Sequence, residues 1–287
     1  MSNQQSKPIA IHLHLYYTEL WEELSQQLQN INGTPYQLFV TIVEDNPQLV
    51  SKIKQFSPSA VITVVPNMGY DVGPFIEFLN SINLDEYSYI LKLHSKRPIN
   101  GLDVKIRNLP VSRKYWKILL SEALIGSPQI WQNNLEQLSQ NSKIGMIASP
   151  HLIKSMEKSD ANLLPRIHEN LQKINLSPIS DFSFVAGTMF LVRSQLLKVL
   201  QHQYKITDFN NTDKNVSDGT LAHVMERLFG AIIKHQGYTI NGFSYNYKFI
   251  CNAICKLILR FFYQSKVTNK NKLLIKILRI PVYQKKL

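Results

Sequence analysis

The sequence contains very little cysteine and no long apolar run. Its only cysteines are Cys251 and Cys255, too few and too close together for a disulfide framework, which favours a reducing, cytoplasmic setting. Without further Cys or His nearby, the same pair is a poor metal site. No run of about 18 uncharged apolar residues occurs, so we expect no membrane-spanning helix. The polar start of the chain, Met1 to Lys7, predicts no secretory signal.

Acidic residues are absent after Glu226. The segment beyond it carries twelve Lys and Arg, which equals the net charge of +12 of the whole chain, so the remainder is neutral. With 287 residues that are 44% hydrophobic, the chain can form one large domain with a basic appendage. Duplex-binding proteins present their basic face within a recognisable motif. Because none is found, we expect no nucleic-acid partner.

Strands and helices alternate along the first hundred residues. Expected strands cover 9–16, 36–43, 60–65 and 87–93, and helical spacing of apolar residues separates them. The third of these strands is continuously apolar, as a strand buried on both faces would be. Further on, we expect helices at 113–124, 128–138 and 221–235, and strands at 144–148, 184–193 and 238–240. This order predicts an α/β fold with a mostly parallel sheet and right-handed crossovers.

A polar cluster follows the fourth expected strand. His94, Ser95, Lys96 and Arg97 stand where that strand ends, and Pro98 stops further pairing. Ligands of parallel sheets bind outside the carboxyl ends of the strands. Cationic side chains and a hydroxyl at such a place favour an anion, most often a phosphate. A solvated basic turn is the alternative interpretation.

Four segments carry a family resemblance: NMGYDVGPFI, YILKLHSKRP, FVAGTMFLVR and DGTLAHVMERLFG. In this order and spacing they resemble the rhamnan synthesis protein F family of bacterial polysaccharide glycosyltransferases, over roughly residues 8–245. The layout is similar to a GT-A-like, Rossmann-type glycosyltransferase. The resemblance implies a catalytic domain at 1–247, with a nucleotide-sugar half at 8–110 and an acceptor half at 111–247, followed by a tail at 248–287.

The resemblance also implies an activity. A sugar, with rhamnose favoured, would pass from a nucleotide diphosphate such as dTDP-rhamnose to a growing, polyprenyl-linked surface polysaccharide. Two other classes of function remain open. One is a non-catalytic subunit that binds a glycan or nucleotide on a transferase scaffold, and the other is a scaffold at the membrane surface.

Candidate donor-binding residues follow the second and third expected strands. Glu44 and Asp45 are placed to meet a base or ribose, although turn chemistry before Pro47 explains them equally well. Asn67, Gly69 and Asp71 lie between strand and helix. Gly69 permits close backbone approach or a positive φ. Asp71 is a candidate for binding ribose or orienting a cation, with a helix cap as the alternative.

His94, Lys96 and Arg97 complete the predicted donor site. They occupy the place where many GT-A enzymes carry an Asp-x-Asp metal motif. Because His and Lys replace hard oxygen ligands with positive charge, we expect transfer without a metal cofactor. A divalent cation stays open as the alternative.

Predicted acceptor and catalytic residues lie in the second half of the chain. Gly187 and Thr188 are expected to form the floor of an acceptor site, although a tight strand crossing also explains the glycine. His223, Glu226 and Arg227 share one helix face through their i, i+3 and i, i+4 spacing. Asp218 is our first choice for the catalytic base and Glu226 the second. A helix cap and an ion pair with Arg227 are their respective alternatives.

The basic tail has cations at every fourth position within apolar stretches. This holds for Lys256 and Arg260, and again for Lys272 and Lys276. We expect two amphipathic helices that bind an anionic membrane surface, with the protein peripheral on the inner face of the cell membrane. The alternative is packing on the catalytic body with the cations reaching water.

Overall fold

The chain divides into two compact units. The computed structural model describes residues 7–97, 103–106, 109–156, 161–209, 219–243, 251, 254–255, 258, 263–268, 272–277 and 280–286. The larger unit comprises residues 1–97 and 117–245, and the smaller one comprises residues 98–116 and 246–287. The site described below lies within the larger unit.

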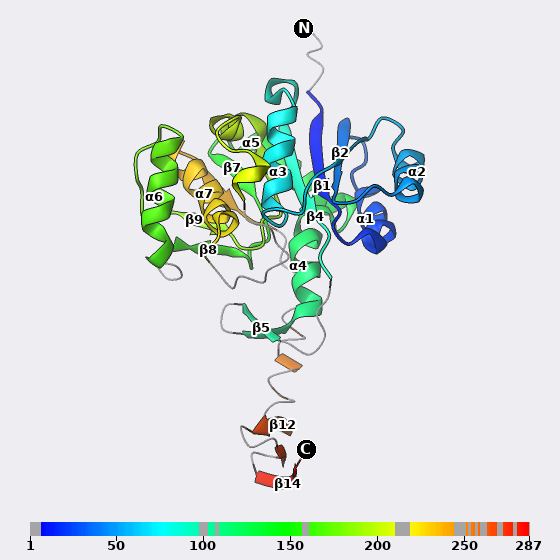
Figure 1. The fold of residues 1–287 in the computed structure, drawn as a ribbon, viewed down its shortest axis with the longest axis vertical. Helices are drawn as coiled ribbons and strands as arrows, with labels where there is room; N and C mark the ends of the chain where they lie inside the picture. The colour runs from blue at the N-terminus through cyan, green and yellow to red at the C-terminus, as the bar shows by residue number, and fades with distance from the viewer. Residues whose placement is uncertain are drawn as a thin grey trace. The chain divides into compact units, whose positions relative to one another are not determined.

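The larger unit contains a seven-stranded sheet in the order β11-β7-β10-β4-β1-β2-β3 (Figure 1). Antiparallel pairing involves only β10 within this sheet, and every other neighbouring pair is parallel. The expected mostly parallel α/β sheet is therefore confirmed. The strands are β1 (Ile9–His14), β2 (Tyr36–Ile42), β3 (Val61–Val64), β4 (Tyr89–His94), β7 (Ile144–Ile147), β10 (Phe190–Arg193) and β11 (Thr239–Asn241).

Helices flank the sheet on both faces. Asn46 caps α2 by accepting a hydrogen bond of 3.0 Å from the Leu49 N–H, and Ser127 caps α5 in the same way. In both helices a proline occupies the first turn, where no N–H is needed. The helices are α1 (Trp21–Leu28), α2 (Pro47–Phe56), α3 (Val72–Ser81), α4 (Arg113–Ile125), α5 (Pro128–Gln140), α6 (Leu164–Lys173) and α7 (Leu221–His235).

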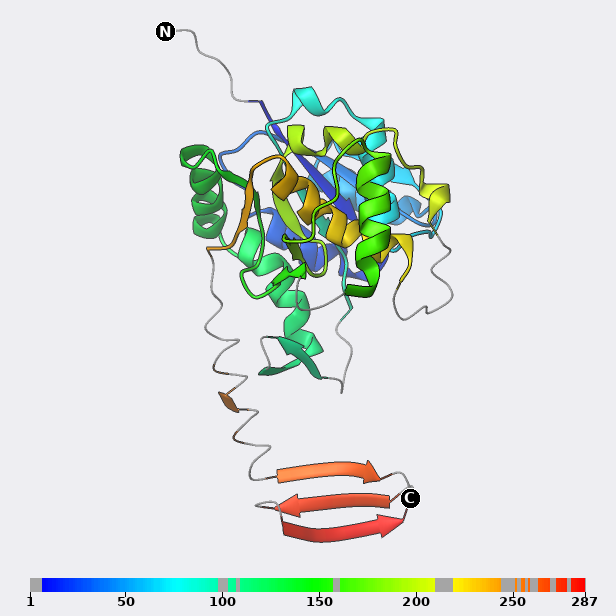
Figure 2. The same cartoon turned by 90° about the vertical axis from the view of Figure 1, so that its left-hand side faces the viewer.

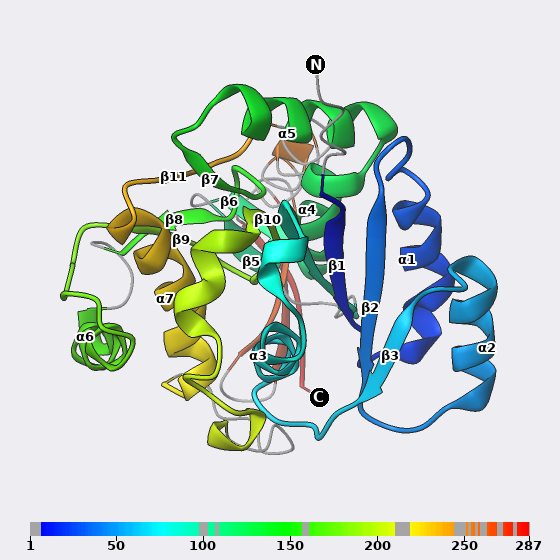
Figure 3. The same cartoon turned by 90° about the horizontal axis from the view of Figure 1, so that it is seen from above.

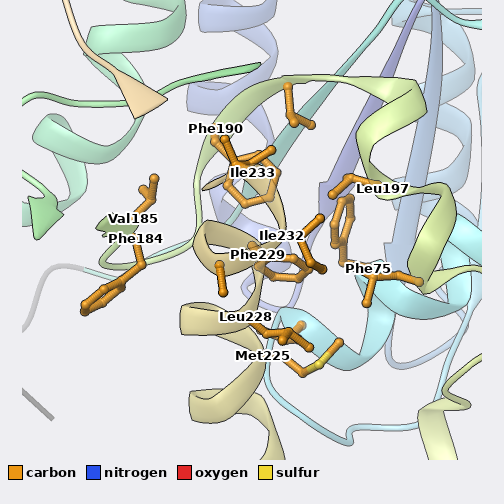
Figure 4. Packing of buried hydrophobic residues seen from close by; sticks show 14 of the residues in the cluster. Phe75, Phe184, Val185, Phe190, Leu197, Met225, Leu228, Phe229, Ile232 and Ile233 are labelled. Atoms are coloured by element: carbon orange, nitrogen blue, oxygen red, sulfur yellow. The ribbon is translucent and has the colours of Figure 1, made fainter. Parts of the chain in front are cut away.

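Helices α3 and α7 cover one face of the sheet, and α5 lies on the other (Figure 3). Rings from three elements meet between α3, α7 and β10. The centroid of Phe75 lies 5.9 Å from that of Phe190 and 5.7 Å from that of Phe229 (Figure 4). Aromatic pairs at such spacings add to the stability that apolar burial already provides.

Helix α7 also packs closely on a second, two-stranded sheet formed by β8 (Ile153–Ser155) and β9 (Ser183–Val185). Gly230 makes this approach possible. A Cβ added there would lie 2.1 Å from the carbonyl oxygen of Ser183. Since α7 carries Glu226, this close packing sets where that carboxylate lies.

Two expectations about strands are wrong. The single strand expected at 184–193 is two strands in different sheets, broken at Gly187 and Thr188, whose φ angles are 87° and 51°. The strand expected to be buried on both faces is β3, where Val61 and Val64 are 46% and 53% exposed. An apolar run does not reveal whether its strand lies at the edge, and β3 pairs with β2 alone within the described chain.

The smaller unit contains a hairpin of β5 (Asp103–Ile106) and β6 (Leu109–Ser112), and a three-stranded antiparallel sheet (Figure 2). The strands of that sheet are β12 (Tyr263–Thr268), β13 (Lys272–Ile277) and β14 (Ile280–Lys286). The second tail helix predicted above is therefore wrong. A spacing of four residues fits one turn of a helix, but it also fits two periods of a strand.

The first predicted tail helix is described at only four positions. Cys251, Ile254, Cys255 and Ile258 are helical and exposed, and the neighbouring residues lie outside the described part. Both cysteines are free thiols. None of the described helices is long and apolar enough to cross a membrane.

Candidate functional site

The candidate site lies at the carboxyl ends of β1 and β4. From β1 the sheet continues through β2 and β3 in one direction, whereas β4 lies on the other side of β1. Such a change of direction is where parallel α/β sheets bind ligands. The two strand ends are joined, because the Ser95 N–H donates to the carbonyl oxygen of His14 (2.9 Å) and the Tyr17 N–H donates to the Ser95 hydroxyl (2.8 Å).

A buried ion pair forms the centre of the site. Lys92 on β4 is 0% exposed, and its ammonium donates to Oδ2 of Asp71 and to the Thr188 hydroxyl at 3.1 Å. The Thr188 hydroxyl donates to the same Asp71 oxygen. Asp71 precedes α3 and Thr188 lies between β9 and β10, so three distant segments converge here. Asp71 is the N-cap residue of α3 by position, but its side chain makes no capping hydrogen bond to the helix.

The partners of Asp71 keep its carboxylate ionised. Burial alone would raise the pKa of Asp71, but the nearby His94 and Lys92, together with the hydrogen bonds from Lys92 and Thr188, hold it far below its usual range. Burial lowers the pKa of Lys92, and the charge of Asp71 opposes that shift. We therefore describe the two groups as an ammonium–carboxylate pair near pH 7.

A second carboxylate, Glu226 on α7, lies next to this pair. Its Oε1 accepts a hydrogen bond of 2.6 Å from the Gly187 N–H, and its Oε2 pairs with Arg227. Burial raises the pKa of Glu226 although Arg227 and the Gly187 N–H oppose the shift, and the charge of Asp71 raises it further. The site thus holds one carboxylate whose pKa is lowered and one whose pKa is raised. Such divergence marks pairs of groups with different roles in acid–base chemistry.

The backbone just before Asp71 and at Thr188 adopts an uncommon conformation. Tyr70 and Thr188 have φ angles of 55° and 51°, which non-glycine residues seldom adopt. A Cβ at Gly69, whose φ is 71°, would lie 2.6 Å from the Phe209 ring. Local strain of this kind is concentrated at functional sites, and here it occurs at Thr188 and next to Asp71, whose side chains are hydrogen-bonded to each other.

Histidines continue the buried polar row beneath α3. His12 and His14 on β1 lie opposite Lys92 and His94 on β4, and both contact the hydroxyl of Thr41, at 3.1 and 3.0 Å. Burial lowers the pKa of His14 to about 4 and that of His94 to about 3. Both rings are therefore neutral near pH 7.

Sequence reasoning missed His12, His14, Thr41 and Lys92. A signal was present for Lys92, because a charged residue inside the apolar strand YILKLH must find a buried partner. The alternation of His with apolar residues in IHLHL was a weaker signal for the two histidines. Neither pattern indicates which residues from distant segments complete the group.

The predicted residues do not all meet at one point. Asp71, His94, Thr188, Gly187 and Glu226 come together: Nδ1 of His94 lies 3.4 Å from Oδ2 of Asp71. The prediction that His94 carries a positive charge is wrong, because burial lowers the pKa of its ring to about 3.

Lys96 and Arg97 are exposed, unlike the buried lysine that pairs with Asp71. Arg97 pairs with Glu19 and lies over the Tyr17 ring, at 4.5 Å from its centroid. The charge of Lys96 helps to lower the pKa of His94, which places it within electrostatic range of the site.

The remaining candidates surround the site or lie beyond the described part. Glu44 and Asp45 are exposed in the turn before α2, and Asn67 is half-buried. The ring of His223 contacts that of Tyr70, and its Nδ1 lies 2.8 Å from the Thr220 hydroxyl. Asp218 lies outside the described residues.

The described residues include no group of three or more His, Cys, Asp or Glu side chains placed to hold a metal ion. Oδ2 of Asp71, the carboxylate oxygen at the centre of the site, already contacts an ammonium and a hydroxyl. These neighbours do not fit a divalent cation at that oxygen, since a metal would displace Lys92.

A family model for rhamnan synthesis protein F matches residues 1–238, which include every residue of this site. The chain belongs to the rhamnan synthesis protein F family. The matched region ends before the basic tail at 248–287, so membership of the rhamnan synthesis protein F family does not depend on that tail.

Two curated relatives match the chain at low identity. The chain is 24% identical over 237 residues to the uncharacterized protein WxcX of Xanthomonas campestris pv. campestris strain B100, and equally similar to WxcX of strain ATCC 33913. These matches cover 82% of this chain but only 32% of WxcX. The chain therefore spans about a third of the length of the curated relatives it matches.

Two solved structures are weakly similar. A crystal structure of S. aureus TarS 1–349 gives a TM-score of 0.42 at 9% identity, covering 83% of this chain and 58% of that one. Glucosyl-3-phosphoglycerate synthase from Mycobacterium tuberculosis, in complex with Mn²⁺, UDP and glucosyl-3-phosphoglycerate, gives 0.37 at 9% identity, covering 97% and 90%. At these TM-scores the two structures add nothing to the assignment of function.

Proposed function

We propose that this chain is a glycosyltransferase of bacterial surface polysaccharide synthesis. The observation that carries the proposal is the pair of carboxylates at the carboxyl ends of the central strands, one with a lowered and one with a raised pKa. Sugar transfer needs an acceptor for the proton of the attacking hydroxyl and a group that holds the donor. Family membership supports the link to polysaccharide synthesis.

Glu226 suits the role of catalytic base. In the reaction, the acceptor hydroxyl gives its proton to Glu226 while its oxygen bonds to the anomeric carbon. The bond from that carbon to the diphosphate breaks, and the nucleoside diphosphate leaves. A base works best when its pKa lies near the working pH, and burial moves the pKa of Glu226 in that direction. Asp218, our first choice from the sequence, remains the alternative base.

The favoured donor is dTDP-rhamnose, and the favoured acceptor is a polyprenyl-linked glycan. The description of the matching family, rhamnan synthesis, supports this choice of sugar. We assign donor contacts to Asp71, His94, Lys96 and Arg97, and acceptor contacts to Thr188 and its neighbour Gly187. His223 and Arg227 are proposed to flank the acceptor. Glu44, Asp45, Asn67 and Gly69 complete the proposed donor side, and no metal cofactor is expected.

Substitution of the two candidate bases tests the proposal. We expect Glu226→Gln to lower kcat for transfer from dTDP-rhamnose by at least 100-fold with little change in KM, because the amide cannot accept the proton. Glu136→Gln on α5, an exposed carboxylate, is the matched control and should retain full activity. If Asp218→Asn abolishes turnover while Glu226→Gln does not, the base is Asp218. A wild-type chain that binds the donor but never turns it over would support the non-catalytic subunit instead.

We also propose that the smaller unit binds an anionic membrane surface. Backbone pairing in the sheet of β12, β13 and β14 places four lysine positions on one face: Lys266, Lys272, Lys276 and Lys286. On the other face it places mainly apolar positions, among them Leu273, Ile275 and Tyr283. No acidic residue occurs in these strands. Each lysine near an anionic surface contributes about 1 kcal/mol, so the lysine face would support peripheral membrane binding.

Vesicle sedimentation tests the lysine face. We expect the chain to sediment with phosphatidylglycerol vesicles at low salt and not with phosphatidylcholine vesicles. Lys272→Glu combined with Lys276→Glu should weaken that binding at least 10-fold. The matched control is Lys52→Glu with Lys143→Glu, two exposed lysines of the larger unit. Equal loss in both double variants would refute a specific role for the sheet.

A further inference from the structure

The buried Lys92–Asp71 pair has a consequence for how the donor is held. Lys92 is fully buried, whereas the Asp71 side chain is 20% exposed. The ammonium therefore does not reach a ligand itself. Its effect on a donor passes through the groups that it contacts, Asp71 and the Thr188 hydroxyl, and Asp71 is the partly exposed member of the ion pair.

The two oxygens of Asp71 differ. Oδ2 receives the hydrogen bonds from Lys92 and Thr188 and lies 3.4 Å from Nδ1 of His94. In the described part of the chain, all three of these groups contact Asp71 through Oδ2 and none contacts it through Oδ1. The carboxylate is thus fixed through one oxygen, and the other can accept a hydrogen bond from a ligand.

We propose that Lys92 is a positioning residue that neutralises Asp71 and orients it to bind a hydroxyl of the donor's sugar or ribose, in place of a divalent cation. This rests on the proposed function. A carboxylate whose charge is already balanced by an ammonium attracts Mg²⁺ or Mn²⁺ weakly, because a second cation would meet the positive charge of Lys92 at close range. A hydroxyl donor meets no such repulsion and gains a charge-assisted hydrogen bond.

The groups facing Asp71 support this role. Lys92 and His94 approach it from β4, and its charge affects the pKa values of His12 and His14 on β1 and of Glu226 on α7. Burial lowers the pKa of all three histidines, so they are neutral near pH 7, and Glu226 pairs with Arg227. Lys92 is therefore the cation that balances Asp71 within the described part of the site.

Binding of dTDP-rhamnose, measured by titration calorimetry on the full chain with and without EDTA, tests the inference. For the wild type we expect the same affinity in both conditions, and an affinity that is nearly constant between pH 5 and pH 8. In Lys92→Met the affinity should fall at least 10-fold. It should also become pH-dependent and weaken as the pH drops, because burial without the ammonium raises the pKa of Asp71. The double variant Asp71→Asn with Lys92→Met should lose that pH dependence.

Two further variants keep the test decisive. Lys52→Met, at an exposed lysine paired with Glu22, should bind like the wild type. Thr188→Val keeps the size of the side chain and removes one hydrogen bond to Asp71. We therefore expect a smaller loss of affinity for dTDP-rhamnose, about 3- to 10-fold. This variant tests the inference even if Lys92→Met does not fold.

Wild-type binding that EDTA abolishes and MnCl₂ restores would overturn the inference. Unchanged, pH-independent affinity in Lys92→Met would also overturn it. Either result could occur in an active transferase, and activity without these binding effects leaves the proposed function standing. Conversely, if no nucleotide sugar is turned over but the binding effects are found, the proposed function fails and the role of Lys92 stands.

Discussion

Substitution of Lys92 by Met should destabilise the protein far more than loss of an ordinary ion pair. The variant leaves the Asp71 carboxylate without its ammonium, beside the neutral ring of His94 and near the carboxylate of Glu226. Removing one partner of a buried pair typically costs about 3–5 kcal/mol, because an uncompensated charge remains. The Asp71 side chain is 20% exposed, so we expect the lower part of that range, about 3 kcal/mol.

Lys52→Met provides the comparison. Lys52 and Glu22 form an ion pair at 2.7 Å with side chains 57% and 66% exposed. Exposed pairs contribute about 0–1 kcal/mol, since water and salt screen them. Each variant removes one lysine ammonium from an ion pair, and the two ion pairs differ in how deeply they are buried.

Urea unfolding followed by tryptophan fluorescence measures both free energies of unfolding. A second substitution, Asp71→Asn, should restore part of the stability lost in Lys92→Met, because it removes the stranded charge. If Lys92→Met costs no more than Lys52→Met, or if Asp71→Asn adds its full cost to that of Lys92→Met, the two groups are not a coupled buried ion pair.

Two other predictions concern stability. The pKa of His14 is about 4 in the folded protein and about 6.5 when unfolded, so stability falls as the pH drops from about 6.5 toward 4. His14→Asn should reduce the stability difference between pH 7 and pH 5 by about 2 kcal/mol in urea titrations, and an unchanged difference would contradict the buried neutral ring. Gly69→Ala should lower the free energy of unfolding by more than about 2 kcal/mol, and Gly33→Ala by about 1 kcal/mol. Both glycines have a positive φ, but only Gly69 faces the Phe209 ring. Equal midpoints in thermal unfolding would refute that difference.

The order of strands and helices was accessible from the sequence because it depends on local patterns. Alternating apolar runs, the Asn46-Pro47 and Ser127-Pro128 helix starts and the Gly237 helix end are all readable along the chain. The same patterns misled in the tail, where β13 has lysines at a spacing that suits helix and strand alike. They also misled at β10, because a turn with two positive φ angles interrupts an apolar run.

The candidate site was accessible only in part. Asp71, His94 and Glu226 were identified from their positions after strands or on one helix face. The cation was assigned to Lys96 and Arg97, which follow β4, but Lys92 within β4 is the residue that pairs with Asp71. A sequence indicates that a lysine in a buried strand needs a partner, but it does not show which distant segment supplies that partner.

By itself, then, the sequence determined the class of fold, the neutral body with its basic tail, and the family. The tertiary structure alone decided which charges meet. Lys92, Asp71 and Thr188 lie up to 117 residues apart along the chain and come together through the packing of α3, β4 and the turn before β10. Periodicity reports which face of an element is buried, whereas the partner of a buried charge depends on long-range packing that no local pattern records.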